Sequence, residues 1–465
     1  MNVNRREALK SALAFAVVPL MPSFALAKND GGFFELTAQT ARKPLHNVPD
    51  KLSELWTYNG ELPGPKITIT AGERVKVRFK NMLDEPTSVH WHGIRIDNAM
   101  DGVAGLTQEP VMPGDVFDYD FIAPDAGTYW YHAHNMSWNQ VPRGLAGPLI
   151  IQDKEPMVPD AQDITMVLSD WILDENGQLN TAAFGSPGLF SHGGQLGNWL
   201  TVNGVSLPDI SLTAGKWHRL RLINASSARV LDIDPSRFGA ELIGYDGQTF
   251  LKPVKTEGPL RFAPAQRMDL IVKPKEAGTV PFEMVTGKPF TFANFIVLPN
   301  ESVEENTIDL PQPNDLPLPE ISAARLLPLV MVGGAMGQLD QLVYKGEELS
   351  GSRFMETKQF WGLNGVAGME MDKPYFTAKR GETIMLESEN QTAWPHAMHI
   401  HGHHFQVLEI NGEVQESHVW RDTFLAERGD KVRIAFVADN PGKWLIHCHM
   451  LGHAASGMMN WFEVV

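Results

Sequence analysis

The sequence has little cysteine, no long apolar stretch and no excess of basic residues. Cys448 is the only cysteine among 465 residues, so no disulfide can form within the chain. The apolar run at residues 11–20 is too short to span a membrane, and nothing after it is long enough either. Lys and Arg number 39 against 55 Asp and Glu, a formal charge of −16. This acidic balance argues against nucleic acid and anionic membranes as partners.

The first 27 residues have the pattern of an export signal. Arg5 and Arg6 precede the apolar run, and Ala25-Leu26-Ala27 offers small residues for cleavage. The segment resembles a twin-arginine signal, which predicts export of the folded protein to a bacterial periplasm. Removing it takes away three bases and one acid and leaves 36 − 54 = −18. An exported, unpaired cysteine invites oxidation unless its thiolate is occupied, and a metal ion would occupy it.

The remaining chain shows a repeat at the scale of whole domains. Three segments run from an Asn-Gly pair through an apolar-alternating stretch to a glycine turn and a second strand; they begin at Asn59, Asn203 and Asn364. Alternation at period two with frequent turns predicts antiparallel β-sandwiches. We place three all-β domains at about 33–153, 160–299 and 323–465, with a Pro- and acid-rich linker between the last two. Helix signals are sparse, with short helices expected at 422–427 or after His449.

The first and third domains each contain two His-x-His pairs. The middle domain has none, and its histidines, His192 and His218, stand alone. On a strand, both imidazoles of such a pair lie on one face. If the two outer domains pack together, eight histidines converge, and eight imidazoles can hold three copper ions with open positions for oxygen. The four pairs are His90 and His92, His132 and His134, His399 and His401, and His447 and His449.

Cys448 lies between two of these histidines but faces the other way. Because side chains alternate along a strand, Cys448 points to the opposite face from His447 and His449. His396 is three residues before His399 and five before His401, so it also points away from those histidines and lies on the side of Cys448. His453 and Met458 follow shortly after. Two imidazoles, a thiolate and a weak thioether are the ligands of a blue-copper electron-transfer site. Structural zinc fits less well because zinc sites close at four ligands. A buried strand with hydrogen-bonded histidines is the alternative, and the complete spacing argues against it.

These motifs resemble those of three-domain bacterial multicopper oxidases, a group that includes laccases and cuprous oxidases. The resemblance covers most of the chain after the signal and implies three cupredoxin-like Greek-key β-sandwich domains. It implies four copper ions, one type 1, one type 2 and two type 3. The implied ligands are His396, Cys448, His453 and Met458 for type 1; His90 and His399 for type 2; His92, His132 and His449 for one type 3 ion; and His134, His401 and His447 for the other.

The resemblance also implies the reaction. A substrate loses one electron at a time at the type 1 copper, four electrons pass through Cys448 to the other three ions, and O2 is reduced to two waters. Asp101 resembles the family's carboxylate near the type 2 copper and would relay protons; an ordinary Asp-Gly turn is the alternative. Ala454 stands where some relatives have another carboxylate. We therefore predict Asp101, His453 and Cys448 as catalytic residues.

Several other residues are assigned structural roles. His403, His404 and His418 are expected to be surface or hydrogen-bonded histidines, since the ligand set is complete without them. Trp91, Trp130 and Trp444 are expected to pack the sandwich cores. Five methionines near the start of the third domain are expected to fill its core, because they are too sparse for the methionine-rich insert of some cuprous oxidases. They are Met331, Met336, Met355, Met369 and Met371.

Three functions remain open. The first is a laccase-type monomer that oxidises phenols, aromatic amines or similar small reductants with O2. The second is a periplasmic oxidase of Cu(I) or Fe(II) that supports copper tolerance. The third is a non-catalytic scaffold, as in relatives of the fold that have lost their coppers, and the complete ligand set argues against it.

Overall fold

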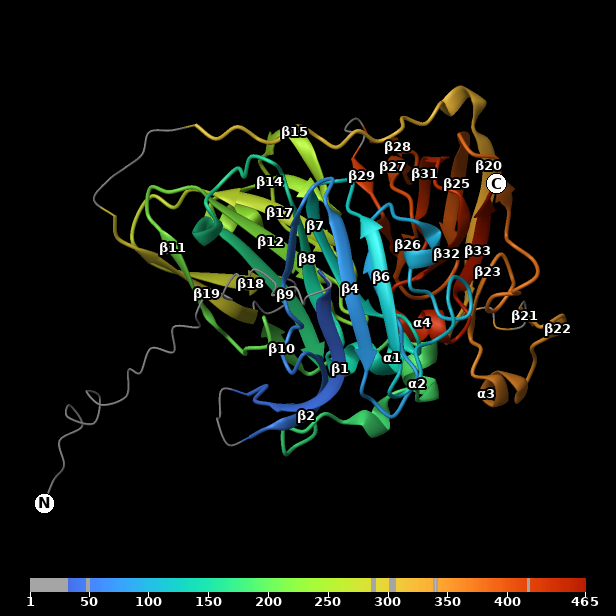
Figure 1. Cartoon of the computed structure of the whole chain (residues 1–465). Coiled ribbons are helices and arrows are strands. Elements are labelled where there is room, and N and C mark those ends of the chain that lie inside the picture. The colour runs from blue at the N-terminus through green and yellow to red at the C-terminus, as the bar shows by residue number, and fades with distance from the viewer. Residues whose placement is uncertain are drawn as a thin grey trace, which may run out of the picture.

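The computed structural model describes residues 32–46, 51–285, 290–300, 307–337, 339, 342–415 and 419–465. Residues 1–27, the predicted signal, and His418 lie outside these ranges. The described residues form three pairs of β-sheets and a small hairpin, with the N-terminal pair in front, the middle pair to its left and the C-terminal pair to its right (Figure 1). Among the described residues no helix is long and apolar enough to cross a membrane.

The N-terminal sandwich consists of two four-stranded sheets. One has the order β2 (Ser53–Tyr58), β1 (Phe34–Lys43), β4 (Arg74–Asn81), β6 (Val116–Ile122). The other has the order β3 (Ile67–Thr70), β8 (Ala146–Gln152), β7 (Gly127–Ala133), β5 (Val89–His92). Along β4 the side chains of Val75, Val77 and Phe79 are buried while those between them are more exposed. This is the period-two pattern that the sequence predicts, and it puts one face of the sheet into the core.

The middle sandwich has a six-stranded and a five-stranded sheet. The first has the order β10 (Trp199–Val202), β9 (Asp163–Trp171), β12 (His218–Asn224), β17 (Arg267–Val272), β14 (Ala240–Tyr245), β15 (Gln248–Val254). The second has the order β11 (Asp209–Thr213), β19 (Phe290–Leu298), β18 (Gly278–Met284), β13 (Leu231–Ile233), β16 (Leu260–Phe262).

The C-terminal sandwich has a seven-stranded and a five-stranded sheet. The first has the order β23 (Trp361–Leu363), β20 (Arg325–Gly333), β25 (Glu382–Asn390), β31 (Lys431–Ala438), β27 (Phe405–Ile410), β28 (Glu413–Val414), with β29 (Trp420–Arg421) also on β27. The second has the order β24 (Thr377–Ala378), β33 (Met459–Val464), β32 (Gly442–Cys448), β26 (His396–Ile400), β30 (Thr423–Ala426). A small hairpin joins β21 (Val343–Tyr344) to β22 (Glu347–Glu348).

Helices are few and short. They are α1 (Ser137–Gln140), α2 (Pro187–Ser191), α3 (Arg353–Thr357) and α4 (Leu451–Ala455), with 3₁₀ turns at Asn98–Met100, Val141–Arg143, Asp160–Gln162, Thr181–Ala183, Pro235–Phe238 and Ile321–Ala323. The prediction of a helix after His449 is confirmed by α4. The alternative at 422–427 is wrong, because Thr423–Ala426 pairs with β26 along its whole length.

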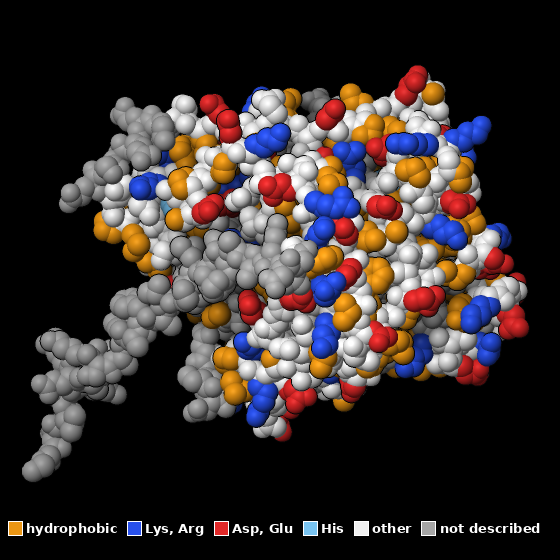
Figure 2. Space-filling view, viewed as in Figure 1, with side chains coloured by type: hydrophobic (Ala, Val, Ile, Leu, Met, Phe, Trp, Pro, Cys, Tyr) orange, Lys and Arg blue, Asp and Glu red, His pale blue; other side chains and the backbone are white. Residues whose placement is uncertain are grey.

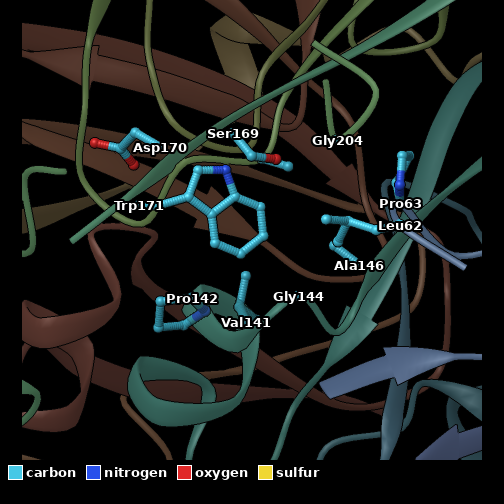
Figure 3. Close-up of a pocket in the computed structure, with 11 residues that line it drawn as sticks. Leu62, Pro63, Val141, Pro142, Gly144, Ala146, Ser169, Asp170, Trp171 and Gly204 are labelled. Carbon is cyan, nitrogen blue, oxygen red and sulfur yellow. The ribbon is translucent and has the colours of Figure 1, made fainter. Parts of the chain in front are cut away.

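The sandwiches pack tightly against one another. A small buried cluster joins Trp130 of β7 to Val167 and Ile223 of the middle sandwich. The cavity beside this junction has a volume of about 10 Å³, and the ring of Trp171 points into it (Figure 3). That volume suits about one water molecule and excludes an organic substrate. On the outer face shown in Figure 2, basic and acidic side chains are interspersed rather than segregated.

Candidate metal centre

Eight histidines meet where the N-terminal and C-terminal sandwiches pack together. Two strand pairs position them in the same way, since β5 and β7 place His90 opposite His132, and β26 and β32 place His399 opposite His447. This matched register is the structural form of the repeat seen in the sequence. The eight residues, here called the histidine cluster, are His90, His92, His132, His134, His399, His401, His447 and His449.

Contacts across the junction are close. The ring of His90 stacks on that of His401 with centroids 4.0 Å apart, and the ring of His92 stacks on that of His399 at 3.8 Å. The possible ligand atoms of several triplets lie within 4.8 Å of one another: His134, His401 and His447; His90, His92 and His132; and His90, His399 and His401. These triplets include seven of the eight histidines, and the eighth, His449, lies against His132, so the structure brings the whole histidine cluster together.

The nitrogen atoms of the cluster are arranged for metal ions rather than for each other. Nε2 of His401 lies 3.1 Å from Nε2 of His447, and Nε2 of His449 lies 3.3 Å from Nε2 of His132. His447 and His132 each have Nδ1 near a backbone oxygen. Nδ1 of His401 lies 3.0 Å from the Asp101 carboxylate. With the protons on Nδ1 of both His401 and His447, the Nε2 lone pairs of these two rings face each other. Four more buried ring nitrogens have no hydrogen-bond partner: His90 Nε2, His92 Nδ1, His399 Nε2 and His449 Nδ1. Such atoms are costly to bury unless a metal ion binds them.

Burial also keeps six of the cluster imidazoles neutral. It lowers the pKa of His447 to about 3 and lowers the pKa of His92, His132, His134, His401 and His449 well below the usual value. In each case removal from water is the largest cause, and most neighbouring histidines add to it. A neutral imidazole offers a lone pair to a metal ion at physiological pH.

A second group, here called the thiolate site, lies on the opposite face of β32. Sγ of Cys448 lies 3.6 Å from Nδ1 of His396 and 3.8 Å from Nδ1 of His453. The far nitrogens of the two rings are held by Thr392 Oγ1 at 2.8 Å and by the backbone oxygen of His192 at 2.6 Å. Both Nδ1 atoms therefore face the sulfur. Met458 is fully buried in the same core cluster as Cys448.

The thiol of Cys448 is poorly suited to ionise by itself. Burial raises its pKa to about 12, so a cation is needed to stabilise the thiolate. Two imidazoles, one sulfur and a buried thioether supply a donor set suited to copper, and its ring nitrogens are already oriented. The chemistry of both groups fits copper ions.

Comparisons with known proteins agree with this geometry. Two family descriptions, both multicopper oxidase, match residues 40–156 and 345–465. A solved multicopper oxidase from Pseudomonas thermotolerans is 30% identical, with a TM-score of 0.81 over 93% of this chain and 98% of that one. The chain belongs to the multicopper oxidase family.

Other relatives of this multicopper oxidase differ in their named activities. Laccase-2 of Fomitopsis schrenkii is 28% identical, covering 97% of this chain and 93% of its own. A Campylobacter jejuni multicopper oxidase, described as a metallo-oxidase, is 27% identical with a TM-score of 0.77 over 94% of this chain and 92% of its own. The protein shares their cupredoxin-like sandwich fold and is a copper-dependent oxidoreductase that uses O2 as acceptor.

Asp101 contacts two cluster histidines in this multicopper oxidase. Its backbone oxygen accepts a hydrogen bond from Nδ1 of His90 at 2.7 Å, and its carboxylate Oδ2 lies 3.0 Å from Nδ1 of His401. The residue is 1% exposed. It therefore does more than close an Asp-Gly turn, since it fixes the orientation of one predicted type 2 ligand and one predicted type 3 ligand. Ala454 is a buried apolar residue in α4 and offers no proton donor.

A second carboxylate was missed by the sequence analysis. Asp422 lies between β29 and β30, with Oδ1 3.3 Å from Nε2 of His92 and its backbone oxygen 2.9 Å from Nδ1 of His399. Arg267 of β17 holds both carboxylate oxygens, one of them at 3.0 Å from Nη1. Burial alone would raise the pKa of Asp422, but Arg267 and the histidines lower it well below its usual range.

Close packing at this point requires glycine. A Cβ added at Gly93 would overlap the guanidinium of Arg267 and the carboxylate of Asp422, and the φ of +87° is one that other residues rarely adopt. The middle sandwich thus contributes Arg267 to the surroundings of the cluster, although among the described residues it contributes no member of the metal-capable groups. A lone arginine on an apolar strand gives no sequence signal for such a contact.

The remaining assignments had mixed outcomes. His403 and His404 are buried and hydrogen-bonded, as expected; Nδ1 of His403 lies 3.1 Å from the backbone oxygen of His401. Trp91 and Trp444 pack sandwich cores, while Trp130 packs between two sandwiches and against the ring of His132.

The core role predicted for the five methionines holds for Met331 but is wrong for three others, which are exposed by 83%, 56% and 46%: Met336, Met355 and Met371. They lie on connections outside the sheets, where sequence periodicity gives no guidance.

Proposed function

We propose that this chain is a laccase-type oxidase that holds four copper ions. The type 1 ligands are His396, Cys448, His453 and Met458; the type 2 ligands are His90 and His399; the type 3 ligands are His92, His132 and His449 for one ion and His134, His401 and His447 for the other. The observation that carries this proposal is the peptide His447-Cys448-His449, which belongs to both groups. A covalent link of adjacent residues is the short connection that electron transfer between two sites needs.

The chain is divided into a signal segment and three domains and acts as an exported monomer. The three sandwiches are taken as domains at about 33–153, 160–299 and 323–465, of which the first and third share the histidine cluster. The protein acts as a monomer in the periplasm after twin-arginine export of residues 1–27. Cell fractionation of the full chain, with Arg5 and Arg6 intact or both replaced by lysine, tests the location.

When bound, copper supplies one-electron oxidation of the reductant at the thiolate site and four-electron reduction of O2 to two waters at the cluster. The residues of the chain supply orientation and protons. Asp101 Oδ2 accepts the hydrogen bond of His401 Nδ1, and its position between two cluster histidines allows this carboxylate to pass protons toward the reduced oxygen atoms. Asp422 fixes His92 and His399 from the other side.

The reductant docks on the surface of the middle sandwich that covers the thiolate site. His453 is fully buried, and its Nε2 is covered by the backbone oxygen of His192. The surface next to it therefore includes the exposed ring of His192 and the half-buried ring of Trp394, whose centroids lie 5.6 Å apart. Two ring faces of this kind suit flat aromatic reductants, which favours phenols and aromatic amines as substrates.

One observation favours the alternative of a Cu(I) or Fe(II) oxidase. The amide of Ala335 donates to the backbone oxygen of Ser191 at 2.6 Å, which brings the exposed thioether of Met336 to the segment that covers His453. Thioethers are ligands for Cu(I). Under this alternative the same electron path is used with a metal ion as the substrate.

Steady-state oxidation of a dimethoxyphenol and of Cu(I) by copper-loaded protein decides between these functions. We expect phenol turnover, and we expect His192→Ala to lower kcat/KM for the phenol about two- to tenfold, since an aromatic contact contributes about 0.5–1.5 kcal/mol. His192→Phe, which keeps a ring face, should retain most of the activity. If the parent protein turns over Cu(I) but no phenol, the laccase proposal is wrong and the metal-ion oxidase takes its place.

Replacing Asp101 by asparagine should impair the histidine cluster and leave the thiolate site unaffected. The amide keeps the shape of the side chain but cannot carry a proton as a carboxylate does, so we expect O2 uptake to fall about 10- to 100-fold while the blue absorption of the thiolate site is unchanged. Asp97→Asn, in the same loop but exposed, serves as the control. Equal loss of the blue band and of O2 uptake would show that Asp101 supports the fold rather than the cluster.

A further inference from the structure

A pocket of about 280 Å³ reaches the histidine cluster where α1, α4 and the start of β33 come together. Two cluster residues, His134 and His447, form part of its wall. His134 is half-buried, whereas the other seven cluster histidines are buried. The described residues therefore leave the cluster accessible at this edge, next to the triplet of His134, His401 and His447.

Three methionines line the same pocket: Met136, Met369 and Met459. Met136 follows His134 by two residues, and Met459 lies directly opposite His447 in the pairing of β32 with β33. Met369 comes to the same place because the amide of Gly368 donates to the backbone oxygen of Gly457 at 2.7 Å. Three thioethers from distant parts of the chain thus gather beside two cluster histidines.

These methionines do not serve as core filler. Met136 is exposed, and Met369 and Met459 are half-buried. Apart from His134 and His447, none of the described residues that line the pocket has a carboxylate or a basic side chain. Hard divalent cations prefer carboxylate oxygens, whereas thioether sulfur selects the soft ion Cu(I). The lining therefore favours Cu(I) over hard divalent cations.

We propose that this pocket is a Cu(I)-binding site through which copper is loaded into the histidine cluster. The methionines bind Cu(I) from solution or from a donor, and His134 and His447 then replace thioether sulfur with imidazole nitrogen. The step is a ligand exchange in which the ion enters and leaves as Cu(I), so no electron is transferred. The inference rests on the proposed function in one respect, namely that the cluster histidines hold copper.

The test follows metal uptake by apoprotein without oxygen. The variant Met136→Leu/Met369→Leu/Met459→Leu is compared with Met82→Leu/Met112→Leu/Met355→Leu, which changes three exposed methionines that do not line the pocket. After timed exposure to Cu(I), excess ion is removed, bound copper is measured, and the blue band is read after ferricyanide has oxidised the bound Cu(I) to Cu(II). We expect the pocket variant to fill its cluster about tenfold or more slowly, the size of effect typical for groups around a metal site. The blue band should form at the parent rate, because Cys448 lies outside the pocket.

A second measurement needs no copper uptake. Silver(I), a redox-inert substitute for Cu(I), is titrated calorimetrically into fully copper-loaded protein, whose histidine and thiolate ligands are occupied. The parent and the control variant should bind one silver ion that the pocket variant does not. Equal uptake rates and equal silver binding in all three proteins would overturn the proposal, and so would slow loading with Cu(II) as well as Cu(I), since that result indicates a packing role. A parent protein whose cluster takes up no copper would refute the proposed function itself.

Discussion

Replacement of Cys448 by serine is expected to abolish the blue absorption and to reduce O2 uptake to the assay background with every substrate of a small panel. Serine nearly preserves the shape of the side chain, so the packing of β32 against β26 is maintained. It removes the sulfur that lies 3.6 Å from Nδ1 of His396 and 3.8 Å from Nδ1 of His453. A neutral hydroxyl cannot supply the thiolate ligand that the absorption requires.

Copper content distinguishes this result from misfolding. We expect the Cys448→Ser protein to hold three copper ions rather than four, because the histidine cluster uses no atom of the Cys448 side chain. His218→Gln is the matched control, since His218 is a buried histidine of the middle sandwich that accepts a hydrogen bond from the amide of Thr213. It should keep the blue band and O2 uptake. A blue band in the serine variant would refute the assignment of the thiolate site.

The parts of the site that could be predicted from the sequence are those fixed by local strand geometry. His90 and His92 lie on one face because strand side chains alternate, and the same rule turns Cys448 away from His447 and toward His396. These relations need no knowledge of how sandwiches pack. The repeat of the motif in the first and third segments then suggested that the pairs meet, as the stacking of His90 on His401 shows.

Contacts that depend on packing between sandwiches could not be predicted in this way. Arg267 and Asp422 are 155 residues apart in sequence, and neither belongs to a motif with metal-ligand spacing. The contact between His453 and the His192 carbonyl could not be predicted from the sequence either, because a backbone atom is present at every residue and leaves no sequence pattern. The prediction for the exposed methionines was wrong because hydrophobic character alone does not separate core residues from surface residues.

The middle sandwich consequently has a larger part in the protein than its lack of ligand histidines suggests. Its Arg267 holds Asp422, which in turn contacts His92 and His399 of the histidine cluster. Its His192 carbonyl contacts His453 of the thiolate site. Movement of the middle sandwich would therefore disturb two sites at once. Its packing thus contributes to the predicted ligand geometry, although among the described residues it bears none of the metal-capable groups.

Replacement of Arg267 by methionine tests this role of the middle sandwich. Arg267 and Asp422 are both fully buried, and their ion pair holds the carboxylate that contacts His92 and His399. Removing one partner of a buried pair leaves an uncompensated charge and costs about 3–5 kcal/mol. We expect a large fall in the thermal unfolding midpoint of the copper-loaded protein and a loss of copper from the cluster before loss of the blue band.

Arg237→Met is the matched control for this experiment. Arg237 is also in the middle sandwich and pairs with Glu283 at 2.9 Å, but its side chain is 48% exposed, so its loss should cost less than about 1 kcal/mol. Midpoints are compared because a chain of three sandwiches need not unfold in one step. The double variant Arg267→Met/Asp422→Asn removes the unpaired charge and should recover part of the lost stability without restoring cluster copper. If Arg267→Met unfolds at the same midpoint as Arg237→Met and keeps full copper content, the buried pair neither stabilises the fold nor positions His92 and His399.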